Sequence, residues 1–271
     1  GEVDRLKSEA KRLEESGLGY DYAFPESGFP MERKEDVLAL AVTLRESVVI
    51  IETQTPGDGR GNGTGFVIDD DLIITNNHVI SDAYDIVIRT FPGEDSNAEL
   101  VGTDPIWDIA LLRSDRPMGS PSLTWGDSRK LNVNDGVFTI GHPGKMGDWT
   151  LTAGVFVRSI TKSLDFRIRE ESEGDPGTTT TVETTVPSML GASGAPFFNT
   201  NGEVIAVLFA GFGIEEPELL EDSDMAEIGS FSSPAPHRIH SVPAVVSREW
   251  SAGSPAWKVQ ELIEEWLTAE S

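Results

Sequence analysis

The sequence lacks cysteine altogether, and it has few tyrosines, few histidines and few basic residues for its length. Without cysteine the chain has no disulfide framework and no thiolate metal site, and its composition says nothing of a redox compartment. No apolar run approaches the roughly 20 residues that a helix needs to span a bilayer, so we expect no transmembrane segment. A length of 271 residues, with 38% hydrophobic and 25% charged residues, is typical of a soluble globular protein with a full core.

The shortage of basic residues leaves a strong negative charge. The chain has 46 acidic against 21 basic residues, a net charge of -25 and a pI near 4.4. Such a field repels phosphates, so we expect no nucleic-acid partner and no attraction to anionic membranes. An acid-rich, lysine-poor composition is typical of a salt-loving source, although an ordinary acidic enzyme would share it.

The start of the chain shows no secretory signal, because charged residues of both signs follow Gly1 in an amphipathic pattern. Because the chain begins with Gly and not Met, we expect that it has been processed or trimmed, so the missing signal does not indicate the cytoplasm. We favour a secreted or extracytoplasmic location.

Apolar residues at helical spacing predict helices near both ends of the chain. The first two cover residues 2–16 and 32–46, and the last lies within 248–271, with Ser254 as its N-cap and Pro255 in its first turn. We expect the first helix to dock on the rest of the molecule or to join subunits of a homo-oligomer.

Between these helices, short apolar runs alternate with clusters of Asp, Asn, Gly and Pro. This rhythm begins at Val48 and is typical of an all-β barrel, not of a βαβ fold. Asn201 and Gly202 predict a hairpin turn, and residues 239–246 predict a last strand. The first group of runs covers residues 66–68, 72–74, 86–88, 99–101 and 109–112.

Three short motifs carry the chemistry. A serine hydroxyl needs a base and donors for a developing oxyanion, and Ser193 stands in a Gly-rich turn whose N–H groups, from Gly191 and Ser193, would form such an oxyanion hole. His78 follows an Ile-Ile-Thr strand end, and Asp108 precedes an apolar Ile-Ala-Leu-Leu run. The order His, Asp, Ser matches a catalytic triad with His78 as base and Asp108 as its orienting group, although Asp104 is a nearby alternative.

The three motif blocks resemble the signature blocks of trypsin-like serine proteases, in the HtrA/Deg-like or V8-like branch. The blocks read GTGFVIDDDLIITNNHVI, DIALL and GASGAPFFNTNGEVIAV, and the resemblance spans roughly residues 48–245. It implies an all-β, chymotrypsin-like fold of two antiparallel six-stranded β-barrels, polypeptide substrates, no cofactor and no metal. The implied organisation is a helical extension over 1–46, a protease domain over 47–247 with barrels meeting near 125–137, and a C-terminal helix over 248–271. We expect no PDZ module, of the kind that full-length HtrA proteins carry, after the last helix.

Two other interpretations compete with a serine endopeptidase. One is a proteolytically silent HtrA-like chaperone or scaffold protein that acts through its terminal helices. The other is an α/β-hydrolase, whose triad runs Ser, Asp, His. That order would be met by Ser193, then Asp222 or Asp224, then His237 or His240. It fails locally, because the nucleophile elbow needs Gly where this chain has Ala195 and a helix where it has a hairpin.

The residues expected to line the primary pocket carry no charge. In trypsin an Asp six positions before the serine selects basic residues, and here that position is Pro187. Glutamyl-specific relatives carry a His on the strand after the serine, whereas this strand offers Leu208, Phe209, Ala210 and Phe212. We therefore expect cleavage after small or medium apolar residues.

The net charge of -25 gives a prediction about salt. Repulsion among carboxylates destabilises the folded chain at low ionic strength, and screening relieves it. We predict that Tm rises from low to molar KCl, as measured by circular dichroism. A flat or falling curve would contradict a salt-loving source without touching the protease interpretation.

Overall fold

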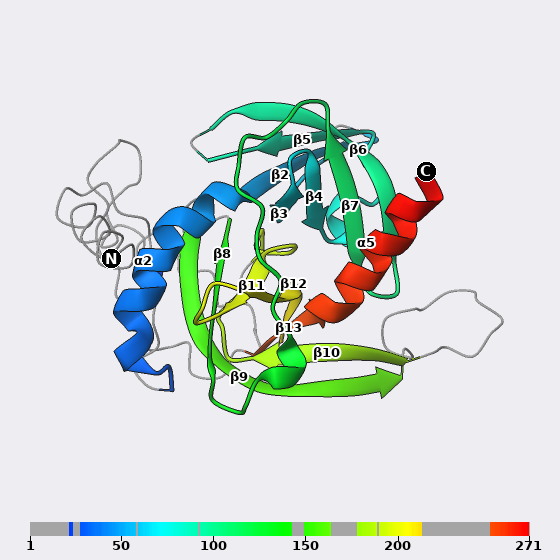
Figure 1. Ribbon diagram of the computed structural model, residues 1–271. Helices are drawn as coiled ribbons and strands as arrows, with labels where there is room; N and C mark the ends of the chain where they lie inside the picture. Colours follow the sequence, from blue (N-terminus) through cyan, green and yellow to red (C-terminus); the bar gives the residue numbers. More distant parts are fainter. Residues whose placement is uncertain are drawn as a thin grey trace, which may run out of the picture.

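The computed structural model places two β-barrels side by side, with one helix along each flank (Figure 1). The predicted helix over 2–16 and the predicted strand over 239–246 lie outside the described residues. The described residues are 22–23, 28–57, 59–91, 93–142, 149–163, 178–188, 190–212 and 250–270.

The first barrel is a closed antiparallel sheet with the strand order β2-β3-β4-β7-β6-β5. Each of the five predicted apolar runs lies on one of its strands, so the alternation of apolar runs and turn residues located them correctly. The strands are β2 (Val48–Thr55), β3 (Gly59–Asp69), β4 (Leu72–Thr75), β5 (Asp85–Arg89), β6 (Asp95–Asp104) and β7 (Ile109–Ser114).

The second barrel closes in the order β8-β9-β10-β13-β12-β11 and back to β8. A short strand, β1 (Tyr22–Ala23), adds to β9 in parallel at Leu151 and Thr152. The predicted all-β fold with two six-stranded barrels is confirmed. The strands are β8 (Gly136–Gly141), β9 (Thr150–Ser163), β10 (Thr178–Thr184), β11 (Pro196–Asn199), β12 (Val204–Phe212) and β13 (Trp250–Pro255).

One hydrophobic core is shared by both barrels. Phe66 and Ile74 of the first barrel pack in the same cluster as Phe138 and Val207 of the second. Because burial of apolar surface is the dominant favourable term in folding, this shared cluster holds the barrels together as one body.

The predicted N-terminal helix over 32–46 is confirmed as α2 (Lys34–Leu44), extended at its ends by the 3-10 turns η1 (Met31–Arg33) and η2 (Arg45–Ser47). Two shorter elements are α3 (Asn77–Ile80) and η3 (Ser128–Lys130). None of the helices in the described part of the chain combines the length and apolar character needed to cross a bilayer.

The predicted C-terminal helix is confirmed as α5 (Ala256–Glu270). The predicted N-cap at Ser254 is wrong, because Ser254 and Pro255 belong to β13 and pair with β12. The Ser254 hydroxyl donates to the carbonyl oxygen of Trp107 and does not cap the helix. Tertiary pairing has therefore overridden a good local start signal.

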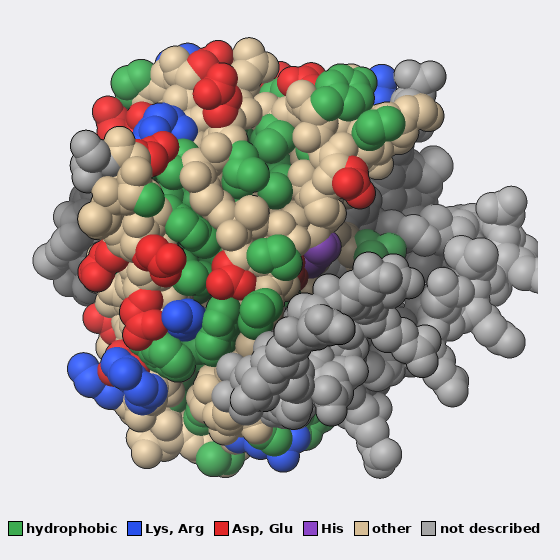
Figure 2. Space-filling model, turned by 90° about the vertical axis from the view of Figure 1, so that its right-hand side faces the viewer, with side chains coloured by type: hydrophobic (Ala, Val, Ile, Leu, Met, Phe, Trp, Pro, Cys, Tyr) green, Lys and Arg blue, Asp and Glu red, His purple; other side chains and the backbone are tan. Residues whose placement is uncertain are grey.

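Helix α5 follows a strand of the second barrel and packs against both barrels, through β12 and β13 of the second and β6 of the first. A Cβ atom at Gly102 on β6 would collide with the ring of Trp266, so only glycine lets the helix approach this closely. Near the helix end, Glu270 accepts two hydrogen bonds from Arg113 at 3.0 and 2.8 Å, and this contact raises the pKa of Arg113. Figure 2, turned toward this flank, shows hydrophobic side chains running between acidic ones.

Candidate functional site

The residues of the three motifs come from different barrels. His78 lies on α3 directly after β4, Asp108 precedes β7, and Ser193 lies in the loop between β10 and β11. The loop reaches the first barrel, since Ser193 O accepts a hydrogen bond from Thr64 N at 2.8 Å.

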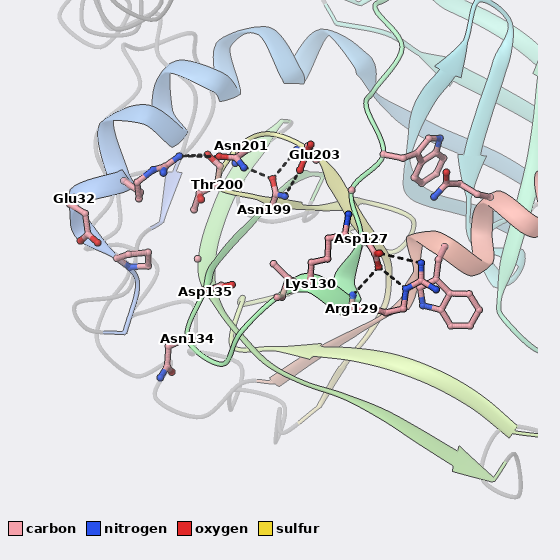
Figure 3. Close-up of a pocket in the computed structure, with 18 residues that line it drawn as sticks. Glu32, Asp127, Arg129, Lys130, Asn134, Asp135, Asn199, Thr200, Asn201 and Glu203 are labelled. Carbon is pink, nitrogen blue, oxygen red and sulfur yellow. Dashed lines mark hydrogen bonds and ion pairs between the residues drawn. The ribbon is translucent and has the colours of Figure 1, made fainter.

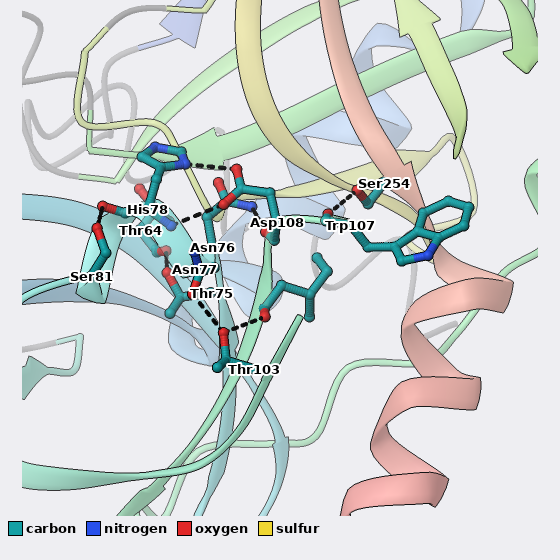
Figure 4. A network of polar contacts seen from close by, with 11 residues as sticks. Thr64, Thr75, Asn76, Asn77, His78, Ser81, Thr103, Trp107, Asp108 and Ser254 are labelled. Atoms are coloured by element: carbon teal, nitrogen blue, oxygen red, sulfur yellow. Dashed lines mark hydrogen bonds and ion pairs between the residues drawn. The ribbon is translucent and has the colours of Figure 1, made fainter. Parts of the chain in front are cut away.

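His78 and Asp108 make two hydrogen bonds (Figure 4). The ring nitrogen Nδ1 lies 2.6 Å from Asp108 Oδ2, and the His78 backbone N–H donates to Oδ1 at 2.9 Å. An ionised carboxylate only accepts, so Nδ1 carries the proton, and in the neutral ring Nε2 is left as an acceptor. The His78 side chain is 46% exposed while that of Asp108 is 15% exposed, so the ring can meet a ligand.

The backbone of Asp108 is unusual. Its φ of 54° lies in the left-handed region, which residues other than glycine rarely adopt. Its carbonyl oxygen accepts a hydrogen bond at 2.8 Å from Nδ2 of Asn76, a fully buried side chain. The alternative, Asp104, has another use: its Oδ1 accepts from the N–H groups of Ile106 and Trp107 and so shapes the turn.

The loop that carries Ser193 is fixed by Thr64 on β3. Thr64 Oγ1 donates to Gly191 O at 2.8 Å, in addition to the contact between Thr64 N and Ser193 O. Gly191 and Gly194 have φ values of 97° and 89°, and a Cβ atom at Gly194 would collide with Thr64 O. The glycines of the motif are therefore required by backbone shape and by the closeness of β3.

The loop leaves two backbone donors available. In the part of the chain that the structure describes, the N–H groups of Gly191 and Ser193 donate to no acceptor. Within the same residues, no hydrogen bond joins the Ser193 hydroxyl to His78. Such contacts are often long in enzymes without substrate and shorten in the complex.

The residues predicted to line a pocket differ in their surroundings. Leu208 is 1% exposed and packs in the core of the second barrel, Phe209 is buried, and Ala210 is half-buried. Pro187 is half-buried, and its carbonyl oxygen accepts a hydrogen bond from Thr152. The Phe212 side chain lies outside the described part of the structure.

Ser188, in the segment before Ser193, lies close to Gly211 at the end of β12, and neither residue was predicted to belong to the site. A Cβ atom at Gly211 would lie 2.5 Å from the hydroxyl oxygen of Ser188, so glycine allows this close approach. Leu190, next to Gly191, is 94% exposed although it is apolar.

Thr64 and Asn76, which hold the serine loop and the aspartate turn, were not predicted from the sequence. Both stand inside motif blocks, in GTGFV and TNNHV, and both are 0% exposed. Polar residues next to apolar runs were the available signal, since a buried polar side chain needs a partner.

A concave region lies away from His78, Asp108 and Ser193 (Figure 3). It is a groove of about 920 Å³ beside η3 and the β11–β12 hairpin, and its lining includes none of His78, Asp108 and Ser193. Arg129 donates to Asp127 at 2.8 Å and lowers the pKa of that carboxyl, while Asn199 donates to Glu203 at 2.7 Å. In the described residues no group of three or more His, Cys, Asp or Glu is arranged to hold a metal ion.

Comparison with known proteins adds to this geometry. The family described as trypsin-like peptidase domain matches residues 63–207, more than half of the chain. A "probable periplasmic serine endoprotease DegP-like" of Pseudomonas putida is 36% identical over 165 residues, covering 57% of this chain and 32% of that protein. The chain thus spans about a third of the length of the curated relatives it matches.

Solved structures agree with the fold. The Rv3671c protease from M. tuberculosis, in its active form, has a TM-score of 0.63 at 23% identity, covering 90% of this chain and 88% of that one. The HtrA-type protease AlgW with tripeptide has a TM-score of 0.60 at 21% identity, covering 83% of this chain and 62% of that one. These similarities show that the two barrels are arranged as in chymotrypsin-like proteases.

The contacts of Thr64 give a prediction about the loop. Thr64→Val keeps the side-chain shape but leaves Gly191 O without its donor, which we expect to lower the free energy of unfolding by about 1–3 kcal/mol. Urea denaturation measures this, and hydrogen exchange should be faster in residues 191–195. Thr64→Ser retains the hydroxyl and serves as the control. Equal stability of the Val and Ser variants would contradict the assigned role.

Proposed function

The chain belongs to the trypsin-like peptidase domain family, and we propose that it is a serine endopeptidase that uses His78, Asp108 and Ser193. The observation that carries the proposal is the paired contact between His78 and Asp108, which leaves His78 Nε2 as an acceptor on an exposed ring. The matched family region contains all three residues.

In the proposed reaction, Ser193 Oγ attacks the carbonyl carbon of the scissile peptide bond while His78 Nε2 takes the hydroxyl proton. Asp108 keeps the ring in the required tautomer and stabilises the imidazolium that forms. His78 then gives this proton to the leaving amine, and a water molecule, activated by the same ring, hydrolyses the acyl-enzyme.

The backbone donors supply the stabilisation of the oxyanion. The N–H groups of Gly191 and Ser193, which donate to no acceptor among the described residues, would bind the negative oxygen of the tetrahedral intermediate, each contributing about 3–4 kcal/mol. Thr64 supports this role, because it holds the loop in place through Gly191 O and Ser193 O.

We further propose uncharged primary specificity. The segment before Ser193 approaches the end of β12, and the described residues there, including Pro187, Ser188, Ala210 and Gly211, carry no charge. Burying an unpaired charge costs several kcal/mol, whereas burying Val or Leu contributes about 1.5–3 kcal/mol.

We also propose where the protein is located and consider how it assembles. An extracytoplasmic location is supported by the DegP-like relatives, which are named periplasmic. Homo-oligomer formation through residues 2–16 stays a prediction, since that segment lies outside the described residues.

The triad assignment predicts that Ser193→Ala abolishes peptide cleavage and covalent labelling by a fluorophosphonate probe while leaving Tm unchanged. Removal of the nucleophile leaves only the weak catalysis of the remaining groups. Ser159→Ala, which removes an exposed hydroxyl on β9, is the control and should keep full turnover. Labelling of a different serine would overturn the assignment, and an unlabelled wild-type protein would favour the silent chaperone or scaffold.

The specificity proposal predicts cleavage after Val, Leu, Ala or Met, with Asp and Glu the poorest. Profiling the cleavage sites in a denatured protein mixture measures this, with Ser193→Ala as the background control. A consensus of Lys or Arg, or of Glu, immediately before the cut would show that the pocket carries a charge we have not identified.

A further inference from the structure

We propose that Ser254 is a positioning residue for Asp108, acting through a hydrogen bond that crosses from the second barrel to the first. Its Oγ donates to Trp107 O at 2.5 Å (Figure 4). This inference rests on the proposed function, because it assigns Asp108 the task of orienting His78.

The two peptide planes that flank the Asp108 Cα atom are each held by one side chain. The carbonyl of Trp107 belongs to the plane before this atom and accepts from Ser254, while the carbonyl of Asp108 belongs to the plane after it and accepts from Asn76. Fixing both planes fixes the φ and ψ angles of residue 108, and these angles set the direction of its carboxylate.

The backbone of Asp108 needs such support. A φ of 54° is unfavourable for a residue with a Cβ atom, and strained conformations persist only where the surroundings over-determine them. If the first plane is released, rotation toward ordinary φ values moves the carboxylate. The two hydrogen bonds to His78, at 2.6 and 2.9 Å, would then lose their alignment.

The position of Ser254 also connects the Asp108 turn with the loop that carries Ser193. On β13 it pairs with Val207 of β12, and the next residue of β12, Leu208, accepts a hydrogen bond from Gly194 N at 2.8 Å. Ser254 is 1% exposed, so water is poorly placed to take over its contact. A short path of backbone and hydrogen bonds thus connects the Asp108 turn to the residue that follows Ser193.

The Trp107 side chain is held separately. Its ring lies edge-to-face with Trp257 of α5 at 6.1 Å between centroids, and Lys258 Nζ lies 5.5 Å from its centre. These contacts fix the ring, whereas the Ser254 hydroxyl fixes the peptide plane. Loss of the hydroxyl alone should therefore change alignment with little loss of packing.

The experiment compares Ser254→Ala and Ser254→Cys, which remove or weaken the donor, with Ser254→Thr, which retains a hydroxyl. Thr181→Val is the matched control, because Thr181 is also buried, on the neighbouring β10, and its hydroxyl donates to Ile160 O. The readouts are kcat and KM on a peptide substrate, Tm, and the low-field proton resonance of His78 Nδ1–H, assigned by its loss in His78→Gln.

We expect kcat to fall by about 10- to 100-fold in the Ala and Cys variants, because a misplacement near 1 Å costs about this much. KM should change little, the low-field resonance should move or broaden, and Ser254→Thr should recover both. The Cys variant keeps the test open if the Ala variant does not fold.

Wild-type kcat together with an unchanged low-field resonance in Ser254→Cys would overturn the proposal, as would an equal effect of Thr181→Val. If wild-type protein neither cleaves peptides nor takes up a fluorophosphonate, the proposed function fails. The resonance then still decides whether Ser254 aligns Asp108 with His78.

Discussion

In the described residues, no strand of one barrel of this protein pairs with a strand of the other. The hydrogen bonds that join the described parts of the two barrels therefore involve a side chain or the backbone of a loop. Thr64 provides one such tie at the serine loop and Ser254 provides another at the aspartate turn. The shared apolar core holds the barrels together, but burial has no direction, so the directional hydrogen bonds set their exact relation.

The architecture could be predicted from the sequence because the pattern is strong at short range. Apolar runs bounded by turn residues located the strands of the first barrel, and helical spacing located α2 and α5. The one clear error, at Ser254 and Pro255, arose because this dipeptide is a good helix start. Pairing of β13 with β12 continues through Pro255 and outweighs that local preference.

The candidate site could be predicted only in part. The order of His78, Asp108 and Ser193 follows from short motifs, and the structure brings the first two into direct contact. The residues that hold these groups were missed because their partners are far away in the chain. Thr64 and Gly191, for example, are 127 positions apart. Nor does a sequence pattern reveal that Asp108 has a positive φ, since residues other than glycine rarely adopt one.

The position of α5 has a consequence for the timing of synthesis. The strands of the first barrel and the serine loop leave the ribosome before the helix that packs against β6 and Trp107. A nascent chain that already contains His78, Asp108 and Ser193 still lacks Ser254 and the docked helix. If alignment depends on them as proposed, the growing polypeptide has reduced activity toward itself and its neighbours until β13 and α5 have been translated and have folded.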